Sequence, residues 1–110
     1  MKGGKIDGYR QKKLWKLNDK EFVSLLIGRK GGKTTLRILD KLFERPYNAN
    51  QLCNLLNVDY NTITFHIKIL LEHEYIEKIK VGKTLISHPS DKLIKNYDEY
   101  LIIKKIIEDE

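Results

Sequence analysis

The chain has 110 residues, of which 41% are apolar, and a formal net charge of +6 at pH 7. This length suits one small domain. No apolar run approaches the ~20 residues of a membrane-spanning helix, and no apolar stretch follows the first lysines, so we expect neither membrane insertion nor a secretory leader. The single cysteine excludes an internal disulfide and favours a cytoplasmic location.

The positive charge is unevenly distributed along the sequence. Residues 1–33 contain ten Lys or Arg and three Asp or Glu, whereas residues 34–110 contain eleven and twelve. We interpret residues 1–17 as a basic N-terminal arm, partly disordered because its first eight residues include three glycines. Two roles remain open for the arm: a solvated tail, or a segment that contacts nucleic-acid phosphates.

Two helices are expected after the arm. Asn18, with Glu21 three residues later, has the signature of a helix start. A break at residues 31–32 follows, and a second helix is predicted over about residues 34–44, ending before Pro46. The residues predicted to face inward in these helices are Phe22, Leu25, Leu26, Leu36, Leu39, Leu42 and Phe43.

Residues 47–88 are the most informative segment. Asn48 and Gln51 have the spacing of a capping box, which starts a short helix ending near residue 56. Asn57 readily adopts the left-handed conformation of a tight turn, and Asp59 then caps a second helix, about residues 60–73. The residues predicted to be buried are Leu52, Leu55 and Leu56 in the first helix and Ile63, Ile67 and Leu70 in the second.

A β-hairpin and a last helix complete the pattern. Strands are predicted over residues 76–81 and 84–88, joined at Gly82-Lys83. Pro89 ends the second strand, and Ser90 or Asp91 caps a final helix, about residues 92–108. A helix-turn-helix followed by a hairpin is a winged helix, a unit that most often places its second helix in the major groove of DNA.

Several segments resemble the ArsR-type winged-helix repressors. The run Thr64-Phe65-His66-Ile67 matches that family's Ser-x-His-Leu step in the recognition helix, and residues 28–39 with residues 45–52 are similar to an archaeal ArsR-like subgroup. The resemblance covers about residues 20–90 and implies a winged-helix fold and DNA binding. The family usually has a glycine before the first wing strand. This chain has Glu74 there, so we expect the helix to end without the usual glycine cap.

The predicted DNA-binding residues lie on the outward face of the second helix and on the wing. Asn can pair with adenine through two hydrogen bonds, Thr can contact a thymine methyl, and Lys can reach guanine or phosphate. The wing lysines would supply phosphate contacts, although Glu77 lies among them. The predicted residues are Tyr60, Asn61, Thr62, Thr64, Phe65, Lys68, Lys78, Lys80 and Lys83.

The sequence does not favour phosphate-binding, metal-binding or catalytic chemistry. The run of residues 28–34 has three residues, not four, between its first glycine and its Gly-Lys pair, and it follows a helix rather than a strand, which excludes a phosphate-binding P-loop. Cys53 occupies the place of the first cysteine of the Cys-x-Cys metal site in ArsR relatives, but Leu55 replaces the second. No paired carboxylates, activated nucleophile or complete metal set can be assembled, so neither an enzyme nor a cofactor is predicted.

The histidines also lack the spacing of a metal site. His66 and His73 are two helical turns apart, too far to bind one ion. We interpret His66 as a structural residue whose ring packs while one nitrogen is hydrogen-bonded, with a DNA contact as the alternative. A dimer-interface metal site formed by His88 and Asp91 is only weakly indicated.

The sequence therefore predicts a mainly α fold with a small β-hairpin: a winged helix-turn-helix over residues 18–90 and an added C-terminal helix over residues 91–110. Ile94, Ile103 and Ile106 exceed what one stripe on that helix needs, so we expect a homodimer formed through it. The predicted function is a dimeric, sequence-specific, double-stranded DNA-binding transcriptional regulator, with no identifiable small-molecule effector. The alternative is a winged-helix protein–protein interaction module without specific DNA binding.

Overall fold

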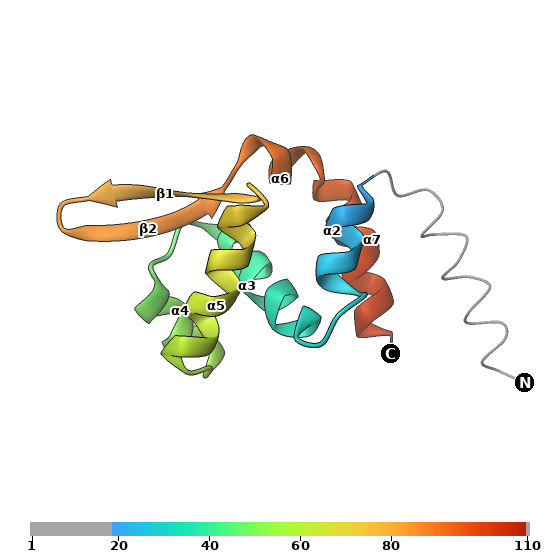
Figure 1. Cartoon of the computed structure of the whole chain (residues 1–110), viewed down its shortest axis with the longest axis horizontal. Helices are drawn as coiled ribbons and strands as arrows, with labels where there is room; N and C mark the ends of the chain where they lie inside the picture. The colour runs from blue at the N-terminus through green and yellow to red at the C-terminus, as the bar shows by residue number, and fades with distance from the viewer. Residues whose placement is uncertain (1–18, 110) are drawn as a thin grey trace, which may run out of the picture. The chain divides into compact units, whose positions relative to one another are not determined.

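The computed structural model describes residues 19–109, which divide into two compact units. The first unit comprises the described parts of Met1–Lys33 and Asn96–Glu110, and the second is Thr34–Lys95. The predicted basic arm and the predicted Asn18 cap lie outside the described residues. Figure 1 shows the order of the helices and strands along the chain. No described helix is long and apolar enough to cross a membrane.

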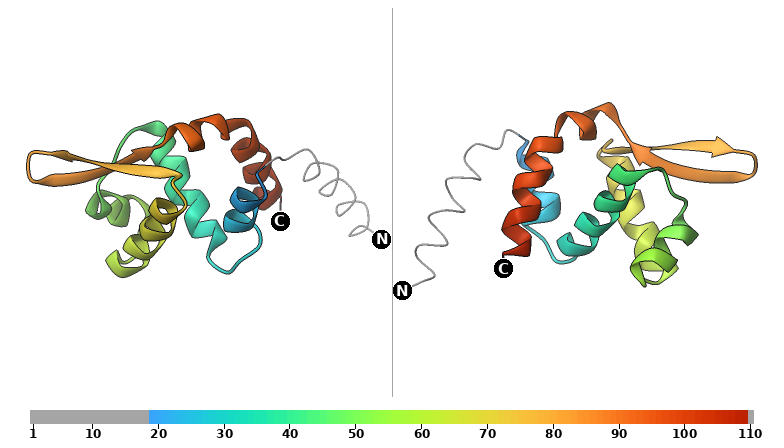
Figure 2. Two further views of the ribbon diagram at one scale, coloured as in Figure 1. Left: turned by 45° about the horizontal axis from the view of Figure 1, so that its top comes forward. Right: turned by 180° about the vertical axis from the view of Figure 1, so that it is seen from behind.

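The first unit contains helices α2 (Lys20–Leu26) and α7 (Tyr97–Glu108), which lie side by side (Figures 1 and 2). Asp19 caps α2, because its Oδ1 accepts a hydrogen bond of 3.0 Å from the Phe22 amide. The Asp19 amide donates to Glu99 Oε1 at 3.2 Å, and Asn96 Nδ2 donates to Asp19 Oδ2 at 3.0 Å. These bonds join the beginnings of the two helices. The buried apolar residues of this unit are Phe22, Leu25, Leu26, Tyr100, Ile103, Ile106 and Ile107.

The C-terminal segment differs from the single helix that the sequence predicts. It forms α6 (Asp91–Lys95) and then α7, separated at Asn96, whose side chain bonds Asp19. Of the three residues predicted to remain free for a second subunit, Ile94 is 55% exposed, whereas Ile103 and Ile106 are only 0% and 3% exposed within the chain itself. The prediction was wrong for Ile103 and Ile106 because a one-dimensional pattern cannot show how wide a buried stripe is. The large apolar side chains exposed on α7 are Tyr97 and Leu101.

Helix α3 (Gly32–Glu44) begins two residues earlier than predicted. Gly31 has a φ of +89°, and Gly32 is the first helical residue. A Cβ at Gly32 would lie 2.1 Å from the carbonyl oxygen of Leu26, so this position requires glycine. In the second unit α3 buries Leu36, Ile38, Leu39 and Leu42, whereas Phe43 is half-buried.

Helices α4 (Ala49–Leu56) and α5 (Tyr60–Glu72) form the predicted helix-turn-helix. The capping box is present: the Gln51 amide donates to Asn48 Oδ1 at 2.8 Å, and the Asn48 amide donates to Gln51 Oε1 at 2.9 Å. Asn57 has the predicted left-handed conformation, with a φ of 56°. Arg37 of α3 donates from Nη2 to the carbonyl of Leu56 at 2.6 Å, which satisfies an acceptor in the last turn of α4.

One prediction about α4 was wrong. Leu52 and Leu56 are 0% and 5% exposed, but Leu55 is 49% exposed. Leu55 lies about 100° around the helix from Leu56. The buried stripe of this eight-residue helix is too narrow to include both.

The end of α5 also corrects an expectation. The Glu74 amide donates to the Leu71 carbonyl at 3.0 Å, and the Tyr75 amide donates to the Leu70 carbonyl at 2.9 Å. This pair of bonds is the Schellman motif, whose left-handed position glycine usually occupies. Here Glu74 itself adopts that conformation, with a φ of 63°. Helix α5 therefore ends in the left-handed conformation that is typical of glycine, although a glutamate occupies the position.

The wing consists of β1 (Ile76–Val81) and β2 (Thr84–Pro89), which are antiparallel and pair from Ile76 with Pro89 to Val81 with Thr84. Gly82 supplies the positive φ of the turn, 63°. Tyr47 pairs with Ser87 in an isolated bridge, donating its amide at 3.2 Å and accepting at 2.8 Å. This bridge joins the segment before α4 to the wing, which extends beyond the helices of the second unit (Figure 2).

Candidate nucleic-acid interface

The residues that α5 buries determine which of its side chains face outward. Ile63, Ile67 and Leu70 are 0%, 3% and 0% exposed, as predicted. His66 is also buried, and its Nδ1 lies 3.0 Å from the Thr35 hydroxyl of α3. These contacts confirm His66 as a structural residue, and its burial leaves no surface for a base contact.

The opposite face of α5 contains the predicted recognition residues. Tyr60 and Phe65 are 54% and 57% exposed. Asn61 and Lys68 are exposed, and Thr62 and Thr64 are half-buried. Asn61, Phe65 and Lys68 lie four and then three residues apart, so they follow one another along the middle of this face.

Hydrogen bonds within the first turn hold this face in place. The Thr62 hydroxyl donates to Asp59 Oδ1 at 2.6 Å, and the Thr62 amide donates to Asp59 Oδ2 at 3.1 Å. These bonds lower the pKa of the exposed Asp59 carboxyl below its ordinary 3.8. The Thr64 hydroxyl donates to the Asn61 carbonyl at 3.1 Å. Both threonine hydroxyls therefore use their hydrogen atoms within the helix.

A groove of about 510 Å³ lies between α5, the start of α4 and the wing. Of the predicted site residues it brings together Tyr60, Thr64, Lys68, Lys78 and Lys83, and it does not bring in Asn61, Thr62, Phe65 or Lys80. Its lining also includes residues that sequence reasoning missed, namely Asn48, Ala49 and Asn50 at the start of α4 and Leu85 on the wing. The capping box was the signal for the α4 residues, because it marks a helix start beside the turn.

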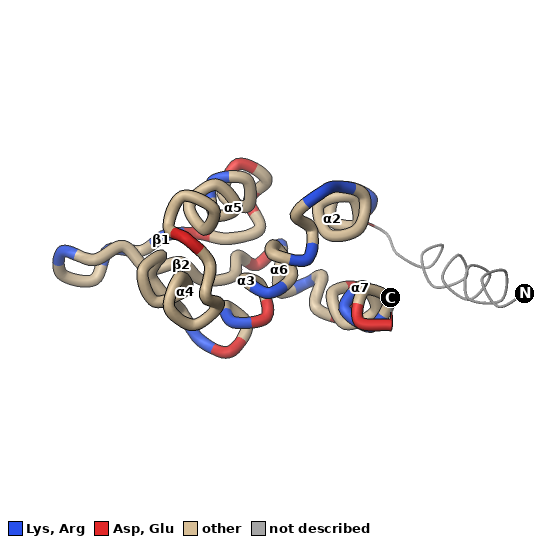
Figure 3. Tube along the Cα trace, turned by 90° about the horizontal axis from the view of Figure 1, so that it is seen from below, with Lys and Arg blue, Asp and Glu red and all other residues tan. Residues whose placement is uncertain are grey.

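The groove is more basic than the second unit as a whole. Residues 34–95 contain nine Lys or Arg and seven Asp or Glu, yet none of the residues that line the groove is acidic and three are lysines. Figure 3 shows basic residues at the far end of the hairpin and on α5. Lys80 pairs with Leu85, so it lies on the groove face of the hairpin although it does not line the groove itself.

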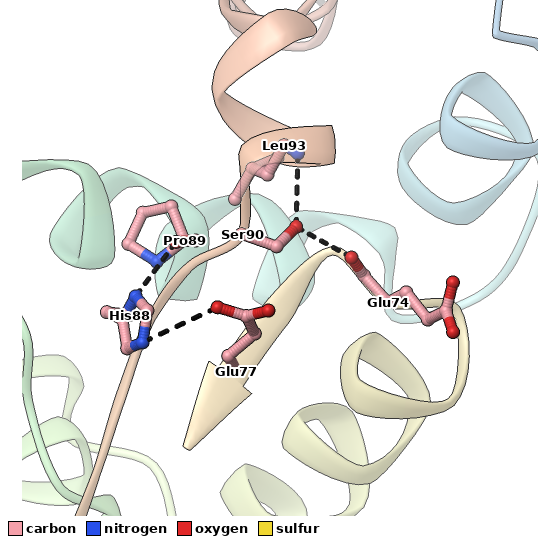
Figure 4. A network of polar contacts seen from close by, with 6 residues as sticks. All are labelled: Glu74, Glu77, His88, Pro89, Ser90 and Leu93. Carbon is pink, nitrogen blue, oxygen red and sulfur yellow. Dashed lines mark hydrogen bonds and ion pairs between the residues drawn. The ribbon is translucent and has the colours of Figure 1, made fainter. Parts of the chain in front are cut away.

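Hydrogen bonds join the base of the wing to the end of α5 (Figure 4). The Ser90 hydroxyl donates to the Glu74 carbonyl at 2.6 Å and accepts from the Leu93 amide at 3.2 Å, so Ser90 caps α6. The Ser90 amide donates to the Tyr75 carbonyl at 3.0 Å. On the adjacent strands, His88 Nε2 lies 3.7 Å from Glu77 Oε1. These contacts set where the wing lysines lie relative to α5.

The remaining candidate sites have no such arrangement. Cys53 is a half-buried free thiol on α4. Residues 19–109 contain no group of three or more His, Cys, Asp or Glu residues placed to hold a metal ion. The glycine-rich run of residues 28–34 follows helix α2 and enters helix α3, which is not the strand-to-helix context of a P-loop.

Comparisons with known proteins agree with this geometry. Residues 32–78 match the family model described as bacterial regulatory protein, arsR family. No curated protein matches the sequence. The family match therefore spans α3, α4, α5 and the beginning of the wing.

Solved structures show the same fold. A MarR transcriptional regulator from Methanosarcina mazei is 19% identical with a TM-score of 0.63, over 96% of this chain and 68% of its own. A probable transcriptional regulator from Pseudomonas aeruginosa is 19% identical with a TM-score of 0.65, over 99% and 81%. Wild-type ZitR from Lactococcus lactis is 19% identical with a TM-score of 0.57, over 97% and 77%.

The family model matches the helix-turn-helix and the beginning of the wing, and the groove also includes wing residues that follow the matched segment. The fold confirms the predicted mainly α architecture with one hairpin. Residues 32–78 therefore match the ArsR-family helix-turn-helix, and the chain is a DNA-binding transcriptional regulator.

Proposed function

We propose that the protein binds specific double-stranded operators as a homodimer, with α5 in the major groove and the wing against the flanking backbone. The observation that carries this proposal is the groove whose lining includes Lys68, Lys78 and Lys83 and no carboxylate. Neutralised phosphates supply most of the affinity of such interfaces, whereas base-edge contacts supply specificity. A nearly neutral domain binds DNA if its cations converge on one surface.

The proposed roles follow from position. Tyr60, Asn61, Thr62, Thr64 and Phe65 occupy the first turns of α5, the part of a recognition helix that meets base edges. Lys68 and the three wing lysines Lys78, Lys80 and Lys83 contact phosphates. The proposed role is binding without catalysis, in the cytoplasm, and no cofactor or effector is assigned to it. The basic arm of residues 1–17, the winged-helix domain of residues 18–90 and the dimerisation element of residues 91–110 remain the proposed division.

Salt dependence of DNA binding tests the role of the lysines. Fluorescence anisotropy with a labelled random 30-base-pair duplex is measured at several salt concentrations for the full chain. Lys78→Ala and Lys83→Ala should each reduce the slope of log affinity against log salt by about one unit. Lys41→Ala is the matched control, because Lys41 lies on α3 beside Glu44 and away from the groove residues. Equal slopes for all four proteins would refute the groove as the phosphate-binding surface.

The proposed dimer rests on α7. Tyr97 and Leu101 are 43% and 44% exposed and lie four residues apart, on one face of the helix. Two-fold pairing of this face would bury both side chains in each subunit. Sedimentation should give twice 13.0 kDa, and Leu101→Asp should give the monomer. A monomeric wild-type protein at micromolar concentration would defeat this part of the proposal.

One observation favours the alternative, a protein-binding module. Phe65 on α5 is 57% exposed, and Ile79 and Val81, on the face of the wing opposite its lysines, are 46% and 57% exposed, which is apolar surface that phosphate binding does not use. Such a module would bind duplex DNA weakly and without sequence preference. Selective binding of one duplex over random DNA at 150 mM salt would reject this alternative.

A further inference from the structure

The exposed face of α5 has an unusual chemical composition for a recognition helix. Helix α5 contains no arginine and no glutamine. Along the middle of its face lie one amide, Asn61, one aromatic ring, Phe65, and one ammonium, Lys68. Arginine or lysine with two hydrogen bonds to guanine is the commonest specific contact in the major groove. Lys68 is the one side chain of this helix that could make that contact with guanine.

Thr62 and Thr64 are further restricted by their own hydrogen bonds. Each hydroxyl donates within the helix, one to the Asp59 carboxylate at 2.6 Å and the other to the Asn61 carbonyl at 3.1 Å. Neither has a hydrogen left to donate to a guanine or thymine oxygen. The part of each side chain without a hydrogen-bond role is its methyl group.

The two charged groups of this helix start and face, Asp59 and Lys68, are also poorly placed to read G·C pairs. A carboxylate can accept from the amino group of cytosine, but both oxygens of Asp59 accept from Thr62. Lys68 lies in the third turn of α5 and lines the groove with Lys78 and Lys83, which suits a phosphate rather than a base.

We propose that α5 reads A·T pairs, recognising thymine through its C5 methyl group and adenine through Asn61. This inference rests on the proposed function, because it assumes that α5 enters the major groove. Thymine alone among the four bases presents a methyl group there, and threonine methyls and phenylalanine rings are its apolar partners. The amide of Asn61 forms two hydrogen bonds with adenine N6 and N7.

The inference is tested by removing the methyl group from the DNA. The full chain is used to select duplexes from a random 30-base-pair library, and the bases protected in the enriched duplex are mapped. Each thymine is then replaced by deoxyuridine, which lacks only the C5 methyl group. A lost buried methyl should weaken binding about fourfold at each contacted thymine. Replacement outside the protected bases should have no effect.

Paired variants locate the contacts. Thr62→Ser and Thr64→Ser keep the hydroxyls that bond Asp59 and the Asn61 carbonyl but remove the methyls. At the one thymine that the lost methyl contacted, each variant should bind the thymine duplex and the uracil duplex with equal affinity. Thr62→Val and Thr64→Val keep a methyl and should retain the fourfold preference. Thr84→Ser, in the groove but on the wing, is the control and should change nothing. Circular dichroism confirms that each variant is folded.

The outcomes separate the inference from the proposed function. An enriched site rich in G·C at the protected bases, or an A·T site indifferent to uracil, would overturn thymine reading and leave sequence-specific binding intact. Threonine-to-serine variants that keep the full uracil penalty at every position would overturn the assignment to Thr62 and Thr64. A library from which no sequence is enriched would overturn the proposed function and this inference together.

Discussion

Replacement of Glu74 by glycine should stabilise the protein. Glu74 has a φ of 63° at the left-handed position that ends α5. That conformation costs a residue with a Cβ about 1–2 kcal/mol, and glycine removes this strain. Glycine loses about 0.5–1 kcal/mol more backbone entropy on folding. The net gain in the free energy of unfolding is therefore about 0.5–1 kcal/mol, a rise in Tm of about 2–8 °C for a chain of this size.

Thermal unfolding followed by circular dichroism measures this gain, and two variants control for other causes. Glu74→Ala removes the carboxylate but keeps the Cβ, so it should leave the Tm nearly unchanged. Asn57→Gly replaces the other non-glycine residue of the described chain that is left-handed, with a φ of 56°, and should gain less stability because asparagine tolerates this conformation. The contacts of the Glu74 backbone, including its carbonyl bond to Ser90, remain in glycine. If Glu74→Gly were no more stable than Glu74→Ala, the strain argument would be refuted.

Three further substitutions test other contacts. Ser90→Ala removes the 2.6 Å bond to the Glu74 carbonyl from a site that is 6% exposed, and should lower the free energy of unfolding in urea by about 1–3 kcal/mol; a loss below about 0.3 kcal/mol would contradict this role. Arg37→Ala leaves the Leu56 carbonyl without its charged donor and should lower the free energy of unfolding by about 0.5–1.5 kcal/mol. Arg37→Lys keeps a charged donor and should lower it by less. Asp59 has a lowered pKa in the folded state, so its contribution is complete at neutral pH, declines as the pH falls below its ordinary 3.8, and vanishes below the folded value. The difference in stability between wild type and Asp59→Asn should therefore shrink on acidification through that range, and a difference independent of pH would reject the charged cap.

Features set by neighbouring residues could be predicted from the sequence. The capping box of Asn48 and Gln51 and the cap of Asp59 follow from chemistry within four residues. The buried positions of α5 follow from helical periodicity, as Ile63 and Ile67 show. These features located the helix-turn-helix and hence the outward face of α5.

Features set by distant residues could not be predicted in this way. The bridge between Tyr47 and Ser87 joins segments 40 residues apart. The end of α6 before Asn96 coincides with the bond of that side chain to Asp19, which is 77 residues away. The left-handed conformation of Glu74 follows from the pairing geometry of a helix end rather than from the preference of glutamate. The composition of the groove depends on such distant pairings as well, since strand register decides which wing residues face α5.

Register also explains how one small hairpin combines two kinds of surface. Because side chains alternate along a strand, Lys78 and Lys80 lie on one face of β1, and Ile79 and Val81 lie on the other. A slip of one residue would exchange the faces and present the apolar pair to the groove. The bridge from Tyr47 to Ser87 and the bond from Ser90 to Glu74 fix β2 at its base and so oppose that slip. The residues proposed to contact phosphates thus depend on backbone contacts near the start of α4 and the end of α5, and weakening those contacts should reduce DNA affinity without altering any lysine.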